Sequence, residues 1–346
     1  MKKTYLNNFH KEYGGYMVDF SGWEMPLHYG SQLTEHLEVR SNVGIFDVSH
    51  MAVFDLTGSA QQEFLRFLLP NDVAKISGET KALYSPLLDE DGGILDDLIV
   101  YSLGQNNFRI ISNCATREQN YDWLRQWGRQ FAVDINFRPE HSIISLQGPS
   151  AHKHIKRLTN NKIAKFELTH DQDMMISGTG YTGENGYEIV SDAINGTRIW
   201  DQFISDGIKP IGLAARDTLR LEAGLNLYGV DMTKSNSPYD SNIAWTVDLN
   251  DKNRDFIGKQ ALINVDKTKV LTGFYTEERG VLRSGAVVRT AYSKGIVTSG
   301  TWSPTFKKNI GFCRIEKNHE NIGTSFLRDK EIDLNFCSNN FLKSLT

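Results

Sequence analysis

The run DGGILDDLIV at residues 91–100 constrains the fold more than any other part of the chain. A glycine pair followed by Ile, Leu and Val on both sides of two acids predicts a turn that leads into a β-strand. Because strand side chains alternate between faces, Asp97 shares a face with Leu95 and Ile99, and Asp96 lies on the opposite face. Whichever face is buried therefore carries a carboxylate, and a buried carboxylate is usually paired, coordinated or used in chemistry. The run indicates a functional site, with a solvated acidic pair at a strand edge as the alternative.

Composition restricts the class of protein. With 346 residues the chain is long enough for two or three domains, and its 40% hydrophobic and 23% charged residues are typical of soluble globular proteins. A net charge of -4 gives no reason to expect binding to nucleic acid or to an anionic membrane. The N-terminus lacks the apolar run of a signal peptide and no stretch is long enough to cross a bilayer, so we expect a cytoplasmic protein. The three cysteines, Cys114, Cys313 and Cys337, are far apart and predict neither a disulfide framework nor a zinc site.

The hydrophobic pattern predicts an α+β region followed by a β-rich domain. Helices are expected at 32–40, 55–69, 119–127 and 211–223 and from about Ser150, and Gly224 fits the end of the fourth. Strands are expected on both sides of the Gly92-Gly93 turn within 82–103, and at 108–113, 142–146, 174–177 and 187–190. After about residue 271 short β-prone segments alternate with Gly, Ser and Asn, which predicts a separate all-β domain.

A second candidate site is the glycine-rich segment at 178–189, GTGYTGENGYEI. Its glycines permit unusual backbone angles and close approach of a ligand. The segment does not stand at the strand-to-helix junction of a dinucleotide fingerprint, and no Gly-Lys-Ser/Thr follows as in a P-loop. A carboxylate such as that of Glu188, on the following strand, suits a ligand with two parallel N–H donors, as in guanine or a pterin. A plain glycine-rich hairpin is the alternative.

A third candidate is the helical segment LAARDTLRLEAG at 213–224. Arg216 and Arg220 are four residues apart and share a helix face, and Asp217 is placed to pair with Arg220. A solvated charged face is the alternative, but the segment is apolar enough to carry an arginine inward. His50 lies near Asp47 and Ser49 in the sequence, which could indicate the catalytic residues of a hydrolase. We expect a structural histidine instead, because the chain has no G-x-S-x-G elbow.

Taken together, these segments resemble the aminomethyltransferase, or T protein, family of the glycine cleavage system. Further matching segments are FSGWEMP at 20–26, FDVSHM at 46–51, LQGP at 146–149, and TSG and SPT at 298–300 and 303–305. They follow the family order from near the N-terminus to about residue 312, together with GGILDDL at 92–98, YTGE at 181–184 and the segment at 213–224.

The resemblance implies an α+β, three-domain fold around a central folate-binding channel, with a C-terminal β-barrel-like domain. We expect a folate-binding region at 1–270, made of two interleaved domains with boundaries near 53, 114 and 140, and the barrel at 271–346. The implied reaction transfers the methylene carbon of an aminomethyl group, carried on the lipoyl arm of the H protein, to tetrahydrofolate. The products are 5,10-methylenetetrahydrofolate and ammonia, and the P and L proteins are the other expected partners. No metal is expected.

The resemblance also assigns roles to individual residues. Asp97, the second acid of the pair, matches the catalytic aspartate, which orients the folate near N5 and N10 and helps manage the proton as N5 attacks. Glu188 matches the acid that pairs with the pterin edge, and Arg216 a folate-contacting arginine. Tyr84 and Asn113 are expected in the channel. Arg220 and Glu184 are expected to be structural.

Two other functions remain as alternatives. One is a related folate-dependent demethylase of a sulfonium or N-methyl donor. The other is a non-catalytic folate-binding maintenance protein, but such relatives carry a Lys-Gly-Cys motif that is not found in this chain. One departure from the family is at 335–343, where the usual Pro-Phe-containing strand is missing. The resemblance therefore carries over no folate contact of the family to that end of this chain.

Overall fold

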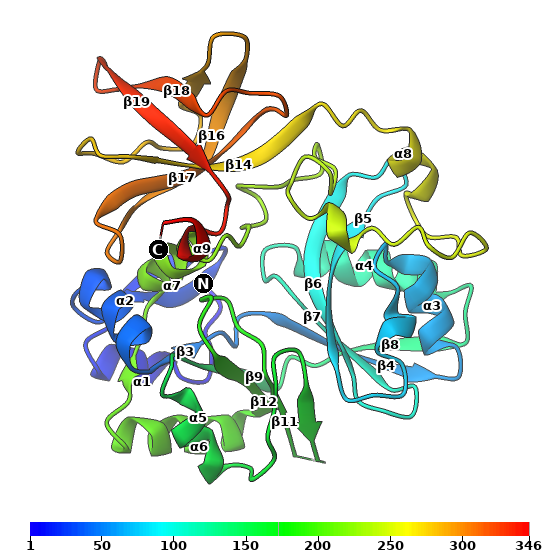
Figure 1. Cartoon of the computed structure of the whole chain (residues 1–346). Helices are drawn as coiled ribbons and strands as arrows, with labels where there is room; N and C mark the ends of the chain where they lie inside the picture. The colour runs from blue at the N-terminus through cyan, green and yellow to red at the C-terminus, as the bar shows by residue number, and fades with distance from the viewer. Residues whose placement is uncertain (172, 346) are drawn as a thin grey trace.

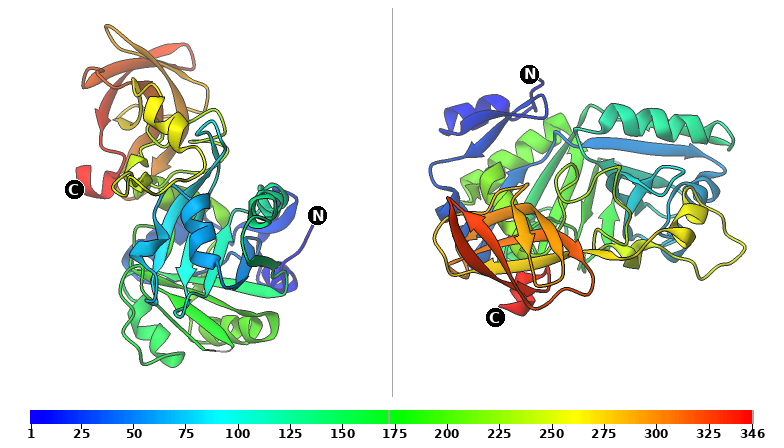
Figure 2. Two further views of the ribbon diagram at one scale, coloured as in Figure 1. Left: turned by 90° about the vertical axis from the view of Figure 1, so that its right-hand side faces the viewer. Right: turned by 90° about the horizontal axis from the view of Figure 1, so that it is seen from above.

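The computed structural model describes residues 1–171 and 173–345. Its described residues form two large open sheets, a small two-stranded sheet and a closed barrel (Figure 1). The barrel stands above the two open sheets (Figure 2, left). No helix among the described residues is long and apolar enough to span a membrane.

The first open sheet contains the acidic strand. It has the order β5-β6-β7-β4-β8 and its paired strands are antiparallel. Its strands are β4 (Ala52–Gly58), β5 (Ala82–Leu88), β6 (Ile94–Ser102), β7 (Phe108–Ser112) and β8 (Val133–Phe137). The elements that pack beside it are α3 (Gln61–Leu68), η1 (Val73–Lys75) and α4 (Arg117–Gly128). Leu98 and Val100 of β6 pack in one core cluster with Phe64 of α3 and Leu124 of α4, so this face of β6 is covered by helices.

The second open sheet has the order β10-β11-β12-β9-β3-β13. Its strands are β3 (Gly44–Asp47), β9 (His141–Gln147), β10 (Leu168–His170), β11 (Met174–Ser177), β12 (Gly186–Asp192) and β13 (Lys209–Pro210), and β13 runs parallel to β3. Beside it lie α5 (Ala151–His154), η2 (Ile155–Arg157) and α6 (Ala193–Ser205).

The two sheets share one apolar core. Val53 and Ile111 of the first sheet pack in one cluster with Phe46, Ile143 and Val190 of the second. Ile99 packs against the same cluster, whereas Leu98 belongs to the cluster under α3 and α4. The face of β6 that carries Asp97 and Ile99 is therefore directed toward the second sheet.

The N-terminal elements and one later helix complete the body. They are α1 (Asn7–Glu12), β1 (Tyr16–Phe20), β2 (Trp23–His28), α2 (Gln32–Ser41) and α7 (Leu213–Glu222). Helices α2 and α7 pack together. The chain then passes through η3 (Ala244–Thr246) and α8 (Lys259–Asn264) before it enters the barrel.

The barrel is closed in the order β14-β17-β16-β15-β18-β19. Its strands are β14 (Lys269–Thr276), β15 (Val287–Arg289), β16 (Lys294–Ser303), β17 (Lys308–Glu316), β18 (Ile322–Leu327) and β19 (Lys330–Cys337), and α9 (Phe341–Ser344) follows. Phe341 of α9 is buried against Phe312 of β17 and Leu221 of α7, so the C-terminal helix lies between the barrel and the body (Figure 1). The α+β class and the C-terminal barrel expected from the sequence are confirmed.

One predicted element is wrong. The sequence pattern predicted a single helix over 55–69, but residues up to Gly58 belong to strand β4 and only Gln61–Leu68 are helical. Asp55 and Leu56 pair with β7 on one side and β8 on the other, so long-range strand pairing overrides the local apolar pattern. At Gly58 φ is +107° and a Cβ would lie 2.3 Å from the carbonyl oxygen of Ala132, so the chain can turn there only with glycine.

Candidate functional site

The glycine turn before β6 is held by close backbone contacts. The amide of Gly93 donates to Asp89 Oδ1 at 2.7 Å. A Cβ at Gly93 would lie 2.2 Å from the carbonyl oxygen of Lys234, so this position requires glycine. The turn fixes where β6 begins and therefore which face each of the two acids occupies.

Asp96 points to the helix side of the sheet and is fully buried, at 0% exposure. Asn113 donates to its carboxylate twice, from Nδ2 at 2.7 Å and from the backbone amide at 3.3 Å. The Thr116 hydroxyl and Asn120 Nδ2 donate to its Oδ2 at 2.7 and 2.5 Å. Burial raises the pKa of Asp96, and these hydrogen bonds oppose that change because they stabilise the ionised carboxylate.

Asp97 is half-buried on the opposite face. Asn113 Nδ2 donates to its Oδ1 at 2.9 Å, and the Tyr84 hydroxyl also hydrogen-bonds to this carboxylate. Burial and the nearby charge of Asp96 raise the pKa of Asp97 well above its usual value, although the bonds from Asn113 and Tyr84 oppose this change. A carboxyl of this kind can gain or lose a proton closer to neutral pH than an ordinary aspartate.

Tyr84 is held by a contact from a distant segment. Its ring stacks on Trp245 of η3 with ring centroids 5.8 Å apart and an interplanar angle of 27°. Trp245 keeps 66% of its surface exposed, so this tryptophan is not a core residue. Local sequence patterns gave no signal for this contact, because the two rings are far apart in the chain and meet only in the fold.

Glu188 and Arg216 approach the site from the second sheet and from α7. Glu188 is buried on β12, and its Oε2 accepts a hydrogen bond from the Thr179 hydroxyl at 2.5 Å. The Arg216 guanidinium lies over the Tyr181 ring, 4.7 Å from its centroid. Burial lowers the pKa of Arg216 and the charge of Glu188 opposes this effect, so the two side chains are electrostatic neighbours. Arg216 Nη1 is buried and, among the described residues, has no hydrogen-bond partner.

Tyr181 connects the two groups of predicted residues. Its ring carries Arg216, its pKa is raised mainly by burial and also by the charge of Asp97, and its hydroxyl donates to the carbonyl oxygen of Asn226. The structure thus brings Asp97, Tyr84 and Asn113 together, and Tyr181 links them to Arg216 and its neighbour Glu188, because the charges of Asp97 and Arg216 both act on Tyr181. The sequence analysis did not single out Tyr181. Its position within the glycine-rich segment was the available signal.

Arg220 and Glu184 are engaged in ion pairs away from Asp97. Arg220 is 2% exposed and pairs with Asp231 at 2.5 Å and with Asp217 at 2.9 Å. Glu184 pairs with Arg40 at 2.8 Å. Both side chains are therefore engaged within the protein, and their assignment as structural residues stays a prediction.

His50 forms no hydrolase triad. The carboxylate of Asp47 is occupied by His10 at 2.9 Å, by the Thr4 hydroxyl at 2.6 Å and by the Ser49 amide at 2.9 Å. The Ser49 hydroxyl donates to a backbone carbonyl, and the buried His50 ring packs edge-on against Phe20. Burial lowers the pKa of His50 to about 4, which keeps this side chain neutral at physiological pH.

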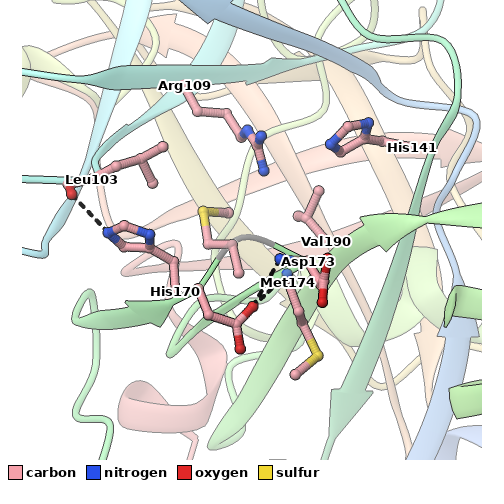
Figure 3. A pocket seen from close by; sticks show the side chains of 9 residues that line it. Leu103, Arg109, His141, His170, Asp173, Met174 and Val190 are labelled. Carbon is pink, nitrogen blue, oxygen red and sulfur yellow. Dashed lines mark hydrogen bonds between the residues drawn. The ribbon is translucent and has the colours of Figure 1, made fainter.

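A metal centre and a separate cavity are the other two kinds of candidate site. Within the described part of the chain, no group of three or more His, Cys, Asp or Glu side chains is arranged to hold a metal ion. A small cavity of about 50 Å³ lies between the ends of the two sheets, where Arg109, His141 and His170 line it (Figure 3). It is lined by none of the five predicted site residues.

Comparison with known proteins gives matches over nearly the whole chain. The family model described as the GCVT N-terminal domain matches residues 6–251, and the glycine cleavage T-protein C-terminal barrel domain matches 269–343. Among curated proteins, the chain is 44% identical to an aminomethyltransferase of Stenotrophomonas maltophilia, covering 96% of this chain and 93% of that protein. It is 45% identical to an aminomethyltransferase of Xylella fastidiosa, covering 96% and 94%.

A solved structure matches in fold as well as in sequence. It is the glycine cleavage system aminomethyltransferase T from Bartonella henselae, with a TM-score of 0.93 and 31% identity, and the match covers 98% of each chain.

Proposed function

Because the chain belongs to the glycine cleavage T-protein family of aminomethyltransferases, we propose that it acts on the aminomethyl group carried by a lipoylated H protein. The enzyme transfers the methylene carbon to tetrahydrofolate, forms 5,10-methylenetetrahydrofolate and releases ammonia. The dihydrolipoyl arm remains on the H protein. The P and L proteins of the same system are the expected suppliers of the aminomethyl group and acceptors of the reduced arm.

The observation that carries this proposal is a group of side chains with unused binding capacity beside Asp97. Arg216 Nη1 is buried without a hydrogen-bond partner among the described residues, and such a donor is costly unless a ligand accepts from it. Folate offers carbonyl and carboxylate oxygens that can accept from this guanidinium. The pterin ring offers parallel N–H donors, which match a carboxylate such as that of Glu188. The residues present therefore fit a reduced folate.

Asp97 is the residue proposed to act at the reacting atoms. Its carboxyl orients the folate near N5 and N10 and helps manage the proton as N5 attacks the methylene carbon and the bond from that carbon to the departing ammonia breaks. N10 then bonds to the same carbon as the carbon–sulfur bond to the lipoyl arm breaks, and the sulfur leaves as a thiol. The raised pKa of Asp97, which burial and Asp96 produce, suits this role. Asn113 and Tyr84 hold the Asp97 carboxylate in place through their hydrogen bonds.

The chain is proposed to divide near residue 270, between a folate-binding body and the barrel. The body combines the two sheets and the helices beside them, and the site residues Asp97, Asn113, Glu188 and Arg216 all belong to it. The barrel contacts the body at α7 through β16 and β17. It therefore supports the helix that carries Arg216.

A two-substrate assay tests the proposed function against its rivals. Purified enzyme is given tetrahydrofolate together with either aminomethylated H protein or dimethylsulfoniopropionate, and folate products are measured. Methylene transfer from the H protein alone is the expected result. Methyl transfer from the sulfonium compound alone would show a demethylase, and folate binding with no transfer from either donor would show a maintenance protein.

A further inference from the structure

The two acids of β6 are neighbours, and in the described part of the chain neither forms an ion pair with a cation. Asp96 is fully buried and Asp97 is half-buried, and they are consecutive residues. Among the ion pairs of the described residues, none involves either carboxylate, although other buried acids such as Glu222 and Asp231 have arginine partners. Two neighbouring carboxylates in such surroundings resist being ionised together.

A single amide group joins the pair. Asn113 Nδ2 donates to Asp96 Oδ1 at 2.7 Å and to Asp97 Oδ1 at 2.9 Å. One oxygen of each carboxylate therefore faces the same nitrogen. This arrangement holds the two side chains in a fixed relation, so the charge of one acts directly on the other.

The remaining hydrogen bonds are divided unequally. Asp96 also accepts from the Asn113 amide, the Thr116 hydroxyl and Asn120 Nδ2. Among the described residues, the side-chain donors to Asp97 are fewer: the Tyr84 hydroxyl and Asn113 Nδ2. Because donors stabilise the ionised form, the negative charge of the pair belongs on Asp96 and the proton on Asp97.

We propose that Asp96 is a positioning residue whose fixed negative charge keeps a proton on Asp97 in the free enzyme. The inference rests on the proposed function, because it concerns the residue assigned to the reaction. It adds a role for an acid that does not itself face the substrate side of the sheet. Asp96 acts through Asp97 and is not a catalytic residue.

The other titratable groups around the pair do not reverse this assignment. Tyr84 of β5, Tyr181 of the glycine-rich segment, and Tyr228 of the segment after α7 all feel the charge of Asp97. Cys114, which follows Asn113, feels the charge of Asp96. Burial raises the pKa of each of these four groups, so each is neutral at physiological pH and adds no negative charge. Arg216 and Arg220 act on Tyr181 but are not among the main causes that set the pKa of Asp97.

The test compares Asp96→Asn with a control that disturbs the same cluster. Asp96→Asn removes the charge but keeps the shape, whereas Thr116→Val removes one donor to Asp96 and leaves both carboxylates. The pH profile of kcat/KM for tetrahydrofolate is measured for both variants. Infrared titration also follows the protonated carboxyl band in the absence of substrate, with Asp97→Asn to identify the band that depends on Asp97.

In Asp96→Asn, two signals should move to lower pH by about one unit or more: the limb of the kcat/KM profile that Asp97 sets, and the titration of the infrared band that Asp97→Asn removes. Thr116→Val removes one of several donors to Asp96 but leaves Asp96 ionised in the pH range where Asp97 titrates, so in this control the limb and the band should stay in place. An unchanged Asp97 limb in folded Asp96→Asn, or an equal downward shift in Thr116→Val, would overturn the proposal.

Wild-type protein alone also provides a decisive measurement if Asp96→Asn does not fold. The wild type should contain a carboxyl that titrates well above the ordinary aspartate range and is missing in Asp97→Asn. Absence of such a carboxyl would overturn the inference even when wild-type transfer activity is normal. The proposed function is tested by a different measurement. If it is wrong, the wild-type enzyme transfers no methylene group, and this holds for any result of the carboxyl titration.

Discussion

At the scale of single residues, Asp97 is expected to control turnover more than binding. Asp97→Asn keeps the size and one acceptor oxygen of the side chain but cannot exchange a proton. We predict that kcat falls by about 10²–10⁴-fold, while the dissociation constant for tetrahydrofolate changes little. Stopped-flow or coupled assays give kcat, and fluorescence titration gives the dissociation constant.

Asp91→Asn is the matched control for this substitution, because Asp91 is exposed in the turn that precedes the same strand. It should leave both quantities unchanged. If Asp97→Asn turns over as fast as the wild type while it binds folate, Asp97 does not have the role proposed for it.

Tyr84 offers a second residue-scale prediction with a definite sign. Its hydroxyl stabilises the ionised form of Asp97, which holds the pKa of Asp97 below the value that burial and Asp96 alone would set. Tyr84→Phe removes that bond, and the pKa of Asp97 should rise further. The Asp97 limb of the pH profile should therefore move to higher pH by about one unit.

This direction is opposite to the shift expected for Asp96→Asn. A shift of the Tyr84→Phe profile to lower pH would contradict the hydrogen bond between Tyr84 and Asp97. Trp245→Phe serves as the control, because it alters the ring that stacks on Tyr84 but leaves the hydroxyl in place.

At the scale of elements, helix α7 carries two arginines with different tasks. Arg220 is closed in by Asp217, Asp231 and the Ser299 hydroxyl, whereas Arg216 Nη1 has no hydrogen-bond partner among the described residues. Arg220→Gln leaves Asp231 buried without its cation and should lower the free energy of unfolding by about 3–5 kcal/mol. Arg216→Gln should leave stability nearly unchanged and raise KM for tetrahydrofolate at least about tenfold.

Each arginine is the control for the other in this comparison, since they lie one helical turn apart. Denaturant unfolding and steady-state kinetics are measured on both variants. A large loss of stability in Arg216→Gln with no change of KM would contradict the assignment of Arg216 to the ligand.

The elements predicted correctly are those whose signals are local. The turn at Gly92-Gly93 and the alternation from Asp96 onward depend on neighbouring residues, and so does the end of α7, where Gly224 has φ of +80°. Leu95 was predicted on the face of Asp97 but packs with Leu98, because the register between β5 and β6 shifts at the start of β6. Strand β4 was mistaken for helix because its pairing with β7 and β8 is set by residues far along the chain. The same distinction applies to the candidate site. Asp97 and Glu188 could be selected from the residues next to them in the sequence, whereas the contact between Tyr84 and Trp245 is visible only in the folded structure.

At the scale of the whole molecule, a buried charge cluster joins the barrel to the body. Glu222 of α7 accepts from Arg40 of α2 at 3.0 Å and contacts His36 Nε2 at 3.1 Å. From the barrel, the Ser303 hydroxyl donates to the same carboxylate at 2.5 Å and the Thr305 hydroxyl at 2.9 Å. Although burial acts to raise it, these partners lower the pKa of Glu222 from 4.5 to about 2.

The lowered pKa of Glu222 makes the stability of the folded protein depend on pH. A carboxylate with a lowered pKa in the folded state stabilises it above its unfolded pKa, and this contribution is lost as pH falls. Glu222→Gln should therefore be less stable than the wild type at neutral pH, and the difference should shrink between about pH 4.5 and pH 2. Thermal unfolding across this range measures the difference.

Glu331→Gln is the control, because Glu331 is exposed on strand β19 of the barrel. It should show no such convergence with the wild type. A constant difference between Glu222→Gln and wild type from neutral pH down to pH 2 would contradict the proposed link between α7 and the barrel.

The most direct measurement of the central claim is a crystal structure of the enzyme with bound tetrahydrofolate. We predict that the pterin lies against the Glu188 carboxylate, that Arg216 Nη1 donates to an oxygen of the folate, and that the Asp97 carboxyl faces N5 and N10. A folate bound in the small cavity beside His141, or anywhere that leaves Asp97 and Glu188 without contact to it, would contradict the account.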